Sequence, residues 1–478
     1  MMLRRFTGRT TLATWGLPPW LLAALLMAVA GTPTANAEQA EPPGQVEQAE
    51  SGPERDELAG VRQAERRLGA AVPIGEGIVL GHVEGNPDAY LPRIDHRRYR
   101  GMNLRPRSGE SKVLSHADST ARIIFGSAGL APGVREVHHF ATPHWITDGY
   151  LRAGQARGPA ADEPDVLNHS WIGQDGRGAG QRRTAHVLRR VDDAVDRHGR
   201  IMVVGVNNAR HSRVPSLLSS AYNVIAVGVA SGASSGGFTQ IEGEDRCKPD
   251  ITGPGNRTSF TTAVVTAVTA RLLEAARRLD EHASQAARPE TIKALLLAGA
   301  TKPWNWRQRD GRPFDEHLGA GVVHLDNALR ILEAGRAQPD TVHQRSGWDL
   351  RVVEPGKTHI YRLDADEPVE ELSIVLNWHR RIDGRTAVHP QTGQQVWLDT
   401  PRLARFDLRV VHISPEGTWQ LIGESRSDVD NVQHVHVRDA PAGEYHVVMT
   451  RRDDDGHAEP WAVAIAWRAG EHVAYPGD

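Results

Sequence analysis

The chain contains very little cysteine, since Cys247 is the only one among its 478 residues. A single cysteine excludes an internal disulfide, so stability must come from packed cores or bound ions. No partner motif surrounds Cys247, which favours a small buried thiol over a nucleophile. The chain also lacks an excess of either charge, with 56 basic and 59 acidic residues and a net charge of -3. Without a basic face, nucleic acid is not an expected partner.

Long apolar runs are missing as well. The one apolar stretch near the N-terminus covers roughly residues 20–30, short of the ~20 residues that a membrane span requires. Three arginines precede it, and small residues in an A-x-A arrangement follow it: Arg4, Arg5, Arg9 and Ala35-Asn36-Ala37. This order is typical of an export signal. We therefore predict a signal peptide over residues 1–37, no membrane anchor, and a secreted or periplasmic protein.

The remaining chain is too long for one compact core and suggests two domains. Residues 38–70 begin with a stretch rich in Glu, Gln, Pro and Gly and are predicted to be an acidic disordered spacer, with a short helical pattern near its end. Residues 71–340 alternate apolar strand-like runs with helical periods. The strands are expected near residues 78–83, 166–167, 201–206 and 224–229, and the helices near 187–195, 260–279 and 289–298. This alternation predicts an α/β domain with a parallel sheet covered on both faces in three layers.

Beyond residue 346 the helical period disappears. Short β-rich runs separated by turns are expected at 358–363, 372–378, 406–413, 432–437, 445–450 and 461–467. Six such strands predict an all-β, jelly-roll-like sandwich domain over residues 346–470.

Residues 248–260 carry the first candidate chemistry. A Pro/Gly-rich loop, Lys248-Pro249-Asp250-Ile251-Thr252-Gly253-Pro254-Gly255, leads into a helix with Ser259 in its first turn. Free N–H groups and the helix dipole favour negative charge at that position, where an acyl-transfer nucleophile needs it. On this segment alone, a helix cap is the favoured interpretation of Ser259.

A second segment strengthens the catalytic interpretation. His116 opens a helical stretch that is followed by Gly126-Ser127-Ala128-Gly129-Leu130-Ala131-Pro132-Gly133. In an α/β domain it is expected at the carboxyl edge of the sheet, where such folds bind ligands. Together, His116 and Ser259 favour nucleophilic catalysis.

These segments resemble the subtilisin-like serine peptidases, the subtilase family with a peptidase S8/S53-type domain, and the chain is similar to a divergent member. The similar blocks are 248–259 (nucleophile), 115–133 (histidine), Asp165 to Gly173 (the strand lining the substrate cleft), 224–228 and 319–323. The resemblance covers roughly residues 75–335 and implies a subtilisin-like fold. It also implies that Ser170, Trp171 and Gly173 bind an extended substrate. The sequence departs from the family at Arg257, at 260–263 and at 117–119.

The resemblance implies a carboxylate at the end of the first strand, where the family has Asp and this chain has Glu84. A carboxylate there would hold the tautomer of His116. Asp88 and Asp95 are alternatives in the following Pro-containing loops. The resemblance also implies an oxyanion-binding amide after residue 206. Asn208 is favoured because Asn207 would occupy a glycine position, and Asn tolerates left-handed backbone; a one-residue shift would select Asn207.

The predicted function is a secreted serine endopeptidase acting on proteins or peptides by a Ser-His-Glu acyl-enzyme mechanism. No cofactor is expected and no metal ligand is assigned. Calcium sites are common in the resembled family, but no block identifies ligands here, and His138 and His139 are expected on opposite faces of a strand. The alternative is an inactive peptidase fold that binds partners through its C-terminal sandwich. Four tryptophans are candidates for its binding platform: Trp348, Trp378, Trp397 and Trp461. Oligomeric state is not predicted.

Overall fold

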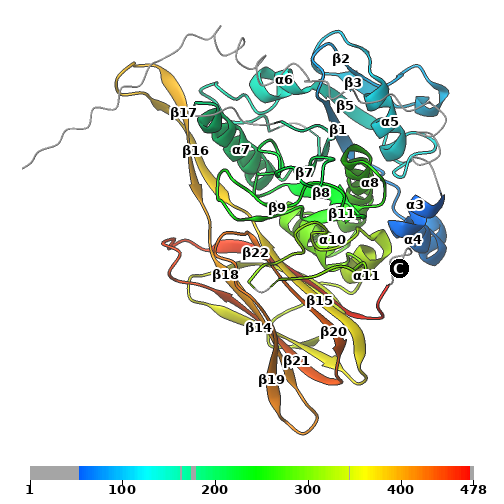
Figure 1. Ribbon diagram of the computed structural model, residues 1–478, viewed down its shortest axis with the longest axis vertical. Helices are drawn as coiled ribbons and strands as arrows, with labels where there is room; N and C mark the ends of the chain where they lie inside the picture. The colour runs from blue at the N-terminus through cyan, green and yellow to red at the C-terminus, as the bar shows by residue number, and fades with distance from the viewer. Residues whose placement is uncertain (1–52, 162–163, 174–178, 310, 344, 474–478) are drawn as a thin grey trace, which may run out of the picture. The chain divides into compact units, whose positions relative to one another are not determined.

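A seven-stranded sheet organises the first part of the computed structural model, which describes residues 53–473 except 162–163, 174–178, 310 and 344. Its strand order is β11-β8-β7-β6-β1-β5-β3, and every neighbouring pair is parallel (Figure 1). The strands are β1 (Val79–Glu84), β3 (Asn103–Pro106), β5 (Glu136–Ala141), β6 (Val166–His169), β7 (Ile201–Gly205), β8 (Ile225–Val229) and β11 (Ile251–Gly253). The predicted parallel α/β sheet is confirmed.

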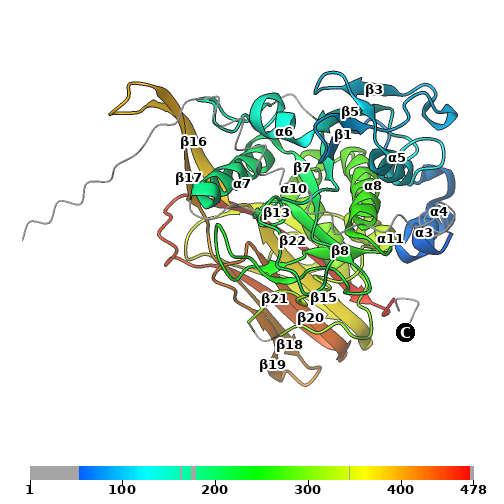
Figure 2. The ribbon, with the colours of Figure 1, turned by 45° about the horizontal axis from the view of Figure 1, so that its top comes forward.

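Successive residues of the strands enter different cores because side chains alternate across a sheet. Val166, Ile201 and Val203 pack into one core with the helices α5 (Ser115–Ile124), α8 (Thr258–Arg277), α10 (Pro289–Ala298) and α11 (Leu325–Glu333). Leu167 and Met202 pack into the other with α7 (Ala179–His198). Figure 2 shows α7 and α8 on opposite sides of the strands. Both faces of the sheet are thus covered, as buried parallel strands require.

Helix α8 is buried on nearly all sides, although several of its buried residues are threonines. The hydroxyls of these threonines are satisfied within the helix. The hydroxyls of Thr262, Thr266 and Thr269 donate to the carbonyl four residues earlier at 2.7, 2.8 and 2.7 Å. Such back-bonding satisfies the hydroxyl without an external partner. The helix can therefore run through the core and hold its first turn in a fixed place.

The prediction of a disordered spacer up to residue 70 is wrong for its last part, whereas the short helical pattern predicted near its end is confirmed. Residues 53–68 form α3 (Pro53–Leu58) and α4 (Val61–Leu68). Ala59, Val61 and Ala64 are buried in the main core, and Arg67 forms ion pairs with Asp326 of α11 and with Glu333. The polar composition of the residues before α3 was extended to the whole segment. The short apolar face of α4, which packs against α11, was therefore not predicted. The predicted signal peptide and the first part of the spacer lie outside the described residues.

The C-terminal β-rich part of the chain forms the predicted sandwich. One sheet has the order β12-β14-β21-β18-β19 and the other β13-β22-β15-β20. Their bounds are β12 (Val342–His343), β13 (Ser346–Val353), β14 (Thr358–Ala365), β15 (Val369–Trp378), β18 (Phe406–Ile413), β19 (Trp419–Ser425), β20 (Val432–Ala440), β21 (Gly443–Arg451) and β22 (Trp461–Gly470). All six predicted strands are present, and their inward side chains form a separate core. The strands β13 and β19 were not predicted.

The proposed tryptophan platform on the sandwich is wrong. Trp348, Trp378 and Trp461 are fully buried, and each indole N–H donates to a backbone carbonyl. Trp397 is half-buried beneath the guanidinium of Arg190, 5.5 Å from the ring centre. Core packing therefore accounts for these aromatic side chains, as it commonly does.

The sandwich and the α/β part belong to one compact unit, residues 41–478. Trp348, Val375 and Ala466 of the sandwich extend the core formed by α10 and α11. A long hairpin of β16 (Arg381–Val388) and β17 (Gln395–Arg402) lies along α7 (Figures 1 and 2). The junction is therefore a packed interface rather than a flexible tether.

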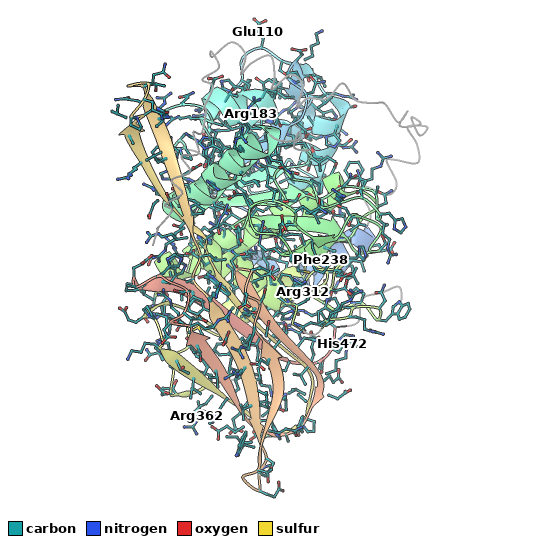
Figure 3. The ribbon with its side chains drawn as sticks, turned by 60° about the vertical axis from the view of Figure 1, so that its left-hand side comes forward. Glu110, Arg183, Phe238, Arg312, Arg362 and His472 are labelled. Atoms are coloured by element: carbon teal, nitrogen blue, oxygen red, sulfur yellow. The ribbon has the colours of Figure 1, made fainter. Side chains whose placement is uncertain are left out.

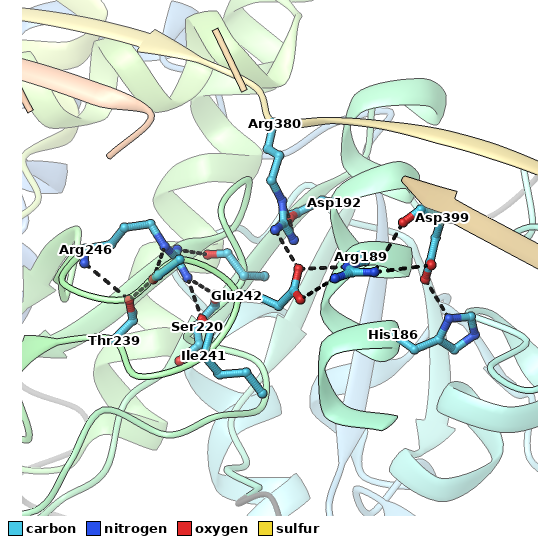
Figure 4. Close-up of polar contacts among 12 residues, drawn as sticks. His186, Arg189, Asp192, Ser220, Thr239, Ile241, Glu242, Arg246, Arg380 and Asp399 are labelled. Atoms are coloured by element: carbon cyan, nitrogen blue, oxygen red, sulfur yellow. Dashed lines mark hydrogen bonds and ion pairs between the residues drawn. The ribbon is translucent and has the colours of Figure 1, made fainter. Parts of the chain in front are cut away.

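A buried charge network joins the two parts at the base of this hairpin (Figure 4). Arg380 contacts Asp192 of α7 at 2.6 Å and Glu242 at 2.7 Å. Glu242 is shared with Arg189, which also reaches Asp399 of the hairpin. Arg380 is 4% exposed and Asp192 is fully buried, so each charge depends on its partner.

Replacing Arg380 by Met is expected to lower the free energy of unfolding by about 3 kcal/mol, because it leaves buried carboxylates without their cation. Denaturant unfolding of the full chain measures this effect. Arg385→Met is the matched control, since Arg385 is exposed on the same hairpin. A change below about 1 kcal/mol for Arg380→Met, the range typical of a surface pair, would contradict the interpretation.

Cys247 lies on the short strand β10 (Cys247–Lys248), which pairs with β9 (Gly237–Phe238). Burial raises the pKa of the Cys247 thiol well above its ordinary value, and its amide donates to Asp430 of the sandwich at 2.9 Å. The guanidinium of Arg312 covers Phe238 at 4.3 Å from the ring centre (Figure 3). The predicted buried thiol is confirmed.

No described helix combines the length and the apolar composition needed to cross a bilayer.

Candidate active site

Glu84 is the last residue of β1 and is 1% exposed. Its carbonyl accepts from the hydroxyl of Thr142 at 2.8 Å, which fixes the end of the strand. Its carboxylate Oε2 lies 2.8 Å from Nδ1 of His116, and its Oε1 accepts from Thr120 at 3.2 Å. The structure therefore brings Glu84 and His116 together. Asp88 and Asp95, the alternatives, are both exposed in loops.

His116 is the second residue of α5, and its side chain remains 37% exposed. Since a carboxylate oxygen only accepts, the proton of the neutral imidazole must be on Nδ1. Nε2 then carries the lone pair, as a general base requires. Glu84 thus fixes the tautomer of His116.

Two opposing effects act on Glu84. Burial alone would raise the pKa of this carboxyl, but the charge and the hydrogen bond of His116 outweigh it and hold the pKa below its ordinary value. Glu84 is therefore a carboxylate at neutral pH. It can stabilise a positive charge on His116.

Ser259 is the second residue of α8 and is half-buried. The helix cap is Arg257, whose side chain makes no capping bond, so the interpretation of Ser259 as the cap is wrong. The preceding loop is anchored by Asp250, which is buried between Lys248 at 2.7 Å and Lys293 at 3.1 Å. These contacts hold β11 and position the first turn of α8.

Ser170 connects Ser259 to the sheet. Its hydroxyl donates to the carbonyl of Ser259 at 2.9 Å, and Ser259 Oγ lies 3.4 Å from the carbonyl of Ser170. In the register of β1 and β6, Val83 pairs with His169, so Glu84 and Ser170 follow at the same level of neighbouring strands. Such strands lie about 4.8 Å apart. His116 and Ser259 are therefore each bound to one of two adjacent strand ends.

Asn208 contacts the start of α8 directly, from the loop after β7. Its Oδ1 accepts from the amide of Thr258 at 2.8 Å and from the hydroxyl of Thr258 at 3.0 Å. This capping leaves the amide group Nδ2 as the donor of the same side chain. Asn207 instead bonds Ser235 and the amide of Ala209. Asn207 is not among the described residues with positive φ, so the left-handed backbone that was expected there is wrong.

The predicted substrate-binding segment is only partly open. Gly173 donates to Leu217 at 2.9 Å and accepts from it at 3.0 Å, so its backbone is already paired. Its N–H group is therefore not open to a substrate, and substrate binding by Gly173 stays a prediction. The indole of Trp171 donates to His169 at 3.2 Å, and Trp171 is half-buried. Ser170 lies beside Ser259 at this edge of the sheet, and Trp171 follows it in the chain.

Sequence reasoning missed two buried histidines next to Glu84, His82 and His139. His82 is 1% exposed, and its Nε2 lies 2.9 Å from Thr120 Oγ1 and 3.3 Å from Glu84 Oε1. Its Nδ1 lies 3.2 Å from Nδ1 of His139. The signal was available, because His82 and Glu84 are two apart in a strand and so share one face.

Burial lowers the pKa of His82, His139 and His169 from 6.5 to about 3 each, so all three are neutral in the folded protein. In the unfolded chain they take up protons near pH 6.5. The unfolded state thus binds more protons between pH 6.5 and 3, and stability falls as the pH falls through this window. By pH 5 the loss is ~2 kcal/mol for each imidazole.

We therefore expect the urea midpoint of the full chain to fall steeply between pH 7 and pH 5. His169→Leu removes one of the three imidazoles and should reduce this pH dependence. Equal midpoints at pH 7 and pH 5 would contradict the neutral state of these side chains.

One cluster among the described residues has the residue types of a metal site: Asp196, Glu290 and His379. It lies where α7 and α10 meet the end of β15. Arg288 bonds both carboxylate oxygens of Glu290 at 3.1 and 2.7 Å, so the negative charge is already matched. This cluster is best described as an ion-paired junction.

A parallel sheet with helices on both faces defines the fold as subtilisin-like α/β, followed here by a β-sandwich. Residues 123–321 match the family model of the Subtilase family, Peptidase S8, so this part of the chain is a subtilase domain. The match includes Ser259, Asn208 and Ser170. It begins after Glu84 and His116, whose assignment depends on the contacts described above.

Several solved structures are similar to this chain. One is fervidolysin from Fervidobacterium pennivorans, a keratinolytic enzyme related to subtilisin, at 14% identity and a TM-score of 0.38, with 87% of this chain and 79% of that chain covered. A subtilase cytotoxin SubAB assembly matches at 16% identity and a TM-score of 0.39, covering 59% and 96%. A lanthipeptide protease matches at 14% identity and a TM-score of 0.38, covering 58% and 95%. No curated protein matches the chain.

Proposed function

We propose that this protein is an exported serine endopeptidase that cleaves peptide bonds through an acyl-enzyme. The single observation that carries the proposal is the bond between Glu84 and His116 at one strand end, with Ser259 bound to the next strand end. The subtilase domain at residues 123–321 supports serine peptidase chemistry in general. The predicted signal over residues 1–37 supports export.

In this mechanism Nε2 of His116 takes the proton of Ser259 Oγ as that oxygen attacks the scissile carbonyl. Glu84 stabilises the imidazolium that forms, because its buried carboxylate already accepts from Nδ1. His116 then gives the proton to the leaving amine. Water, activated by the same imidazole, hydrolyses the ester on Ser259 and restores the hydroxyl.

The oxyanion needs donors at the start of α8. Nδ2 of Asn208 is the proposed side-chain donor, because Oδ1 of the same amide is held by Thr258 and this fixes the amide plane. The backbone amide of Ser259 in the first turn of α8 is proposed to add to it. Ser170 and Trp171 are proposed to border the bound peptide.

The test is hydrolysis of an unfolded protein substrate by the full chain after removal of the predicted signal. We expect cleavage by the unmodified protein, and a fall of about 10⁶ in kcat for Ser259→Ala. Ser284→Ala is a suitable control, since Ser284 lies in the short helix α9 (Ala283–Ala286), away from this edge. Cleavage that persists in purified Ser259→Ala would refute the proposal.

A further inference from the structure

The contacts beneath Glu84 form a chain of donors. Carboxylate oxygens accept only, so Glu84 needs N–H or O–H groups around both oxygens. Oε2 has Nδ1 of His116 at 2.8 Å. Oε1 faces the hydroxyl of Thr120 at 3.2 Å and Nε2 of His82 at 3.3 Å. All these groups are buried except the imidazole of His116, so no water replaces a missing donor.

The tautomer of His82 follows from these neighbours. If Nε2 were unprotonated, its lone pair would face the negative carboxylate of Glu84, which is repulsive. Nε2 must therefore carry the proton and donate toward Thr120 and Glu84. Nδ1 of His82 is then an acceptor, and its neighbour at 3.2 Å is Nδ1 of His139. His139 must therefore carry its proton on Nδ1.

An independent observation agrees with this assignment. Nε2 of His139 is buried without a hydrogen-bond partner among the described residues. With the proton on Nδ1, this atom is an acceptor lone pair, which is left unpaired more readily than a buried N–H. The opposite assignment would leave a buried donor unpaired at the same atom.

Glu84 also needs this support more than a shorter acid would. Glutamate has one more rotatable bond than aspartate, and fixing such a side chain costs up to ~2 kcal/mol of rotamer entropy. Donors on both oxygens select a single rotamer that presents Oε2 to His116. The edges of the His82 ring also contact His139 and Phe125, with ring centres 5.2 and 6.2 Å apart.

We propose that His82 is a positioning residue for the Ser-His-Glu site: as a neutral Nε2–H donor, itself oriented by His139, it holds Glu84 in the rotamer that fixes the tautomer of His116. The inference rests on the proposed peptidase function for its kinetic consequence. Its structural content, a chain of N–H groups pointing from His139 through His82 toward Glu84, is independent of turnover.

Two substitutions separate the effect of the N–H donor of His82 from the effect of its side-chain volume. His82→Leu fills the space without a donor, and His82→Gln places an amide N–H near the position of Nε2. Outer contacts of this kind typically contribute 10–100-fold to activity. We expect His82→Leu to lower kcat about 30-fold with KM within twofold, and His82→Gln to retain kcat within about threefold. Both are compared with His324→Asn, a buried histidine in the same domain with no contact to Glu84 among the described residues.

The same kcat for His82→Leu as for the unmodified protein would overturn the proposal, as would equal losses in His82→Leu and His82→Gln at matched thermal stability. A merely structural role predicts that losses follow stability. The acid limb of the kcat profile adds a second kinetic readout: it should move to a different pH in His82→Leu, because Glu84 is then less firmly held against His116, and stay in place in His324→Asn.

Ring ¹⁵N NMR of the full chain carrying Ser259→Ala tests the tautomers without any activity. The His82 signals are assigned by their loss in His82→Leu. We expect neutral His82 protonated on Nε2 and neutral His139 protonated on Nδ1 from pH 5 to 9. The opposite tautomers would refute the proposal. If the unmodified protein cleaves nothing while the tautomers are as expected, the proposed function fails and this structural inference stands.

Discussion

Replacing His116 by Ala is expected to lower kcat by about 10⁶, the loss typical of removing the base from a serine–histidine unit. His116 is the group that the structure places between the buried carboxylate of Glu84 and the exposed edge of the sheet. Without it, the proposed mechanism has no base to take the proton of Ser259. Steady-state kinetics on a chromogenic peptide measure the effect.

The loss should be kinetic rather than structural, because the side chain of His116 is 37% exposed and contributes little to the core. His457→Ala, at a half-buried histidine of the sandwich, is the matched control and should leave kcat unchanged. Adding Ser259→Ala to His116→Ala should cause almost no further loss, because the two groups act together. A His116→Ala protein that keeps more than a few per cent of its activity would remove His116 from the mechanism.

Replacing Glu84 by Gln is the second large effect, with an expected loss of about 10⁴ in kcat. An amide at this position can direct its NH₂ group to Nδ1 of His116, which would move the imidazole proton to Nε2. The other oxygen, Oε1, faces the hydroxyl of Thr120 and the ring of His82. An amide has only one oxygen, so it cannot accept from these groups and from Nδ1 of His116 as the carboxylate does. The imidazolium would also lose its counter-charge.

Glu84→Asp separates the effect of the carboxylate charge from the effect of side-chain length. The carboxylate remains but is withdrawn by one methylene, and a misplacement of about 1 Å costs on the order of 100-fold. We therefore expect Glu84→Asp to lie between the unmodified protein and Glu84→Gln. Equal activity of Glu84→Gln and the unmodified protein would mean that another group orients His116.

Much of the sheet could be predicted from the sequence, because buried parallel strands are short apolar runs between glycines and helices. The run ending at Glu84 placed the acid at a strand end, and the structure has β1 ending at that residue. Ser259 and His116 were found from loops that lead into helices, a local pattern. Predictions of this kind need no knowledge of distant contacts.

The features that were missed depend on partners far away in the chain. Gly173 is paired with Leu217, which no local pattern indicates. Helix α4 was predicted as a short helical pattern, but its attachment to the domain through the ion pairs of Arg67 with Asp326 and Glu333 was not. His82 was missed because a buried histidine in a strand is usually a matter of packing. The two-residue spacing from Glu84 indicated a shared face of the strand, and the structure adds the contacts of His82 with Glu84 and Thr120.

The sandwich is joined to the α/β part by apolar packing and by buried charges. Helix α10 is buried along its whole length, between the sheet domain and the strands β15 and β22. Arg380 and Asn377 reach across to residues of α7 and α10. We therefore expect the two parts to unfold together, which the Arg380→Met variant already tests.

The most direct measurement of the central claim is the site and rate of modification by a fluorophosphonate, which reacts with an activated serine hydroxyl. The account predicts one adduct, located by mass spectrometry on Ser259, that forms rapidly in the unmodified protein and at a greatly reduced rate in His116→Ala and Glu84→Gln. A folded protein that forms no adduct on Ser259, or forms it equally fast without His116, would contradict the account.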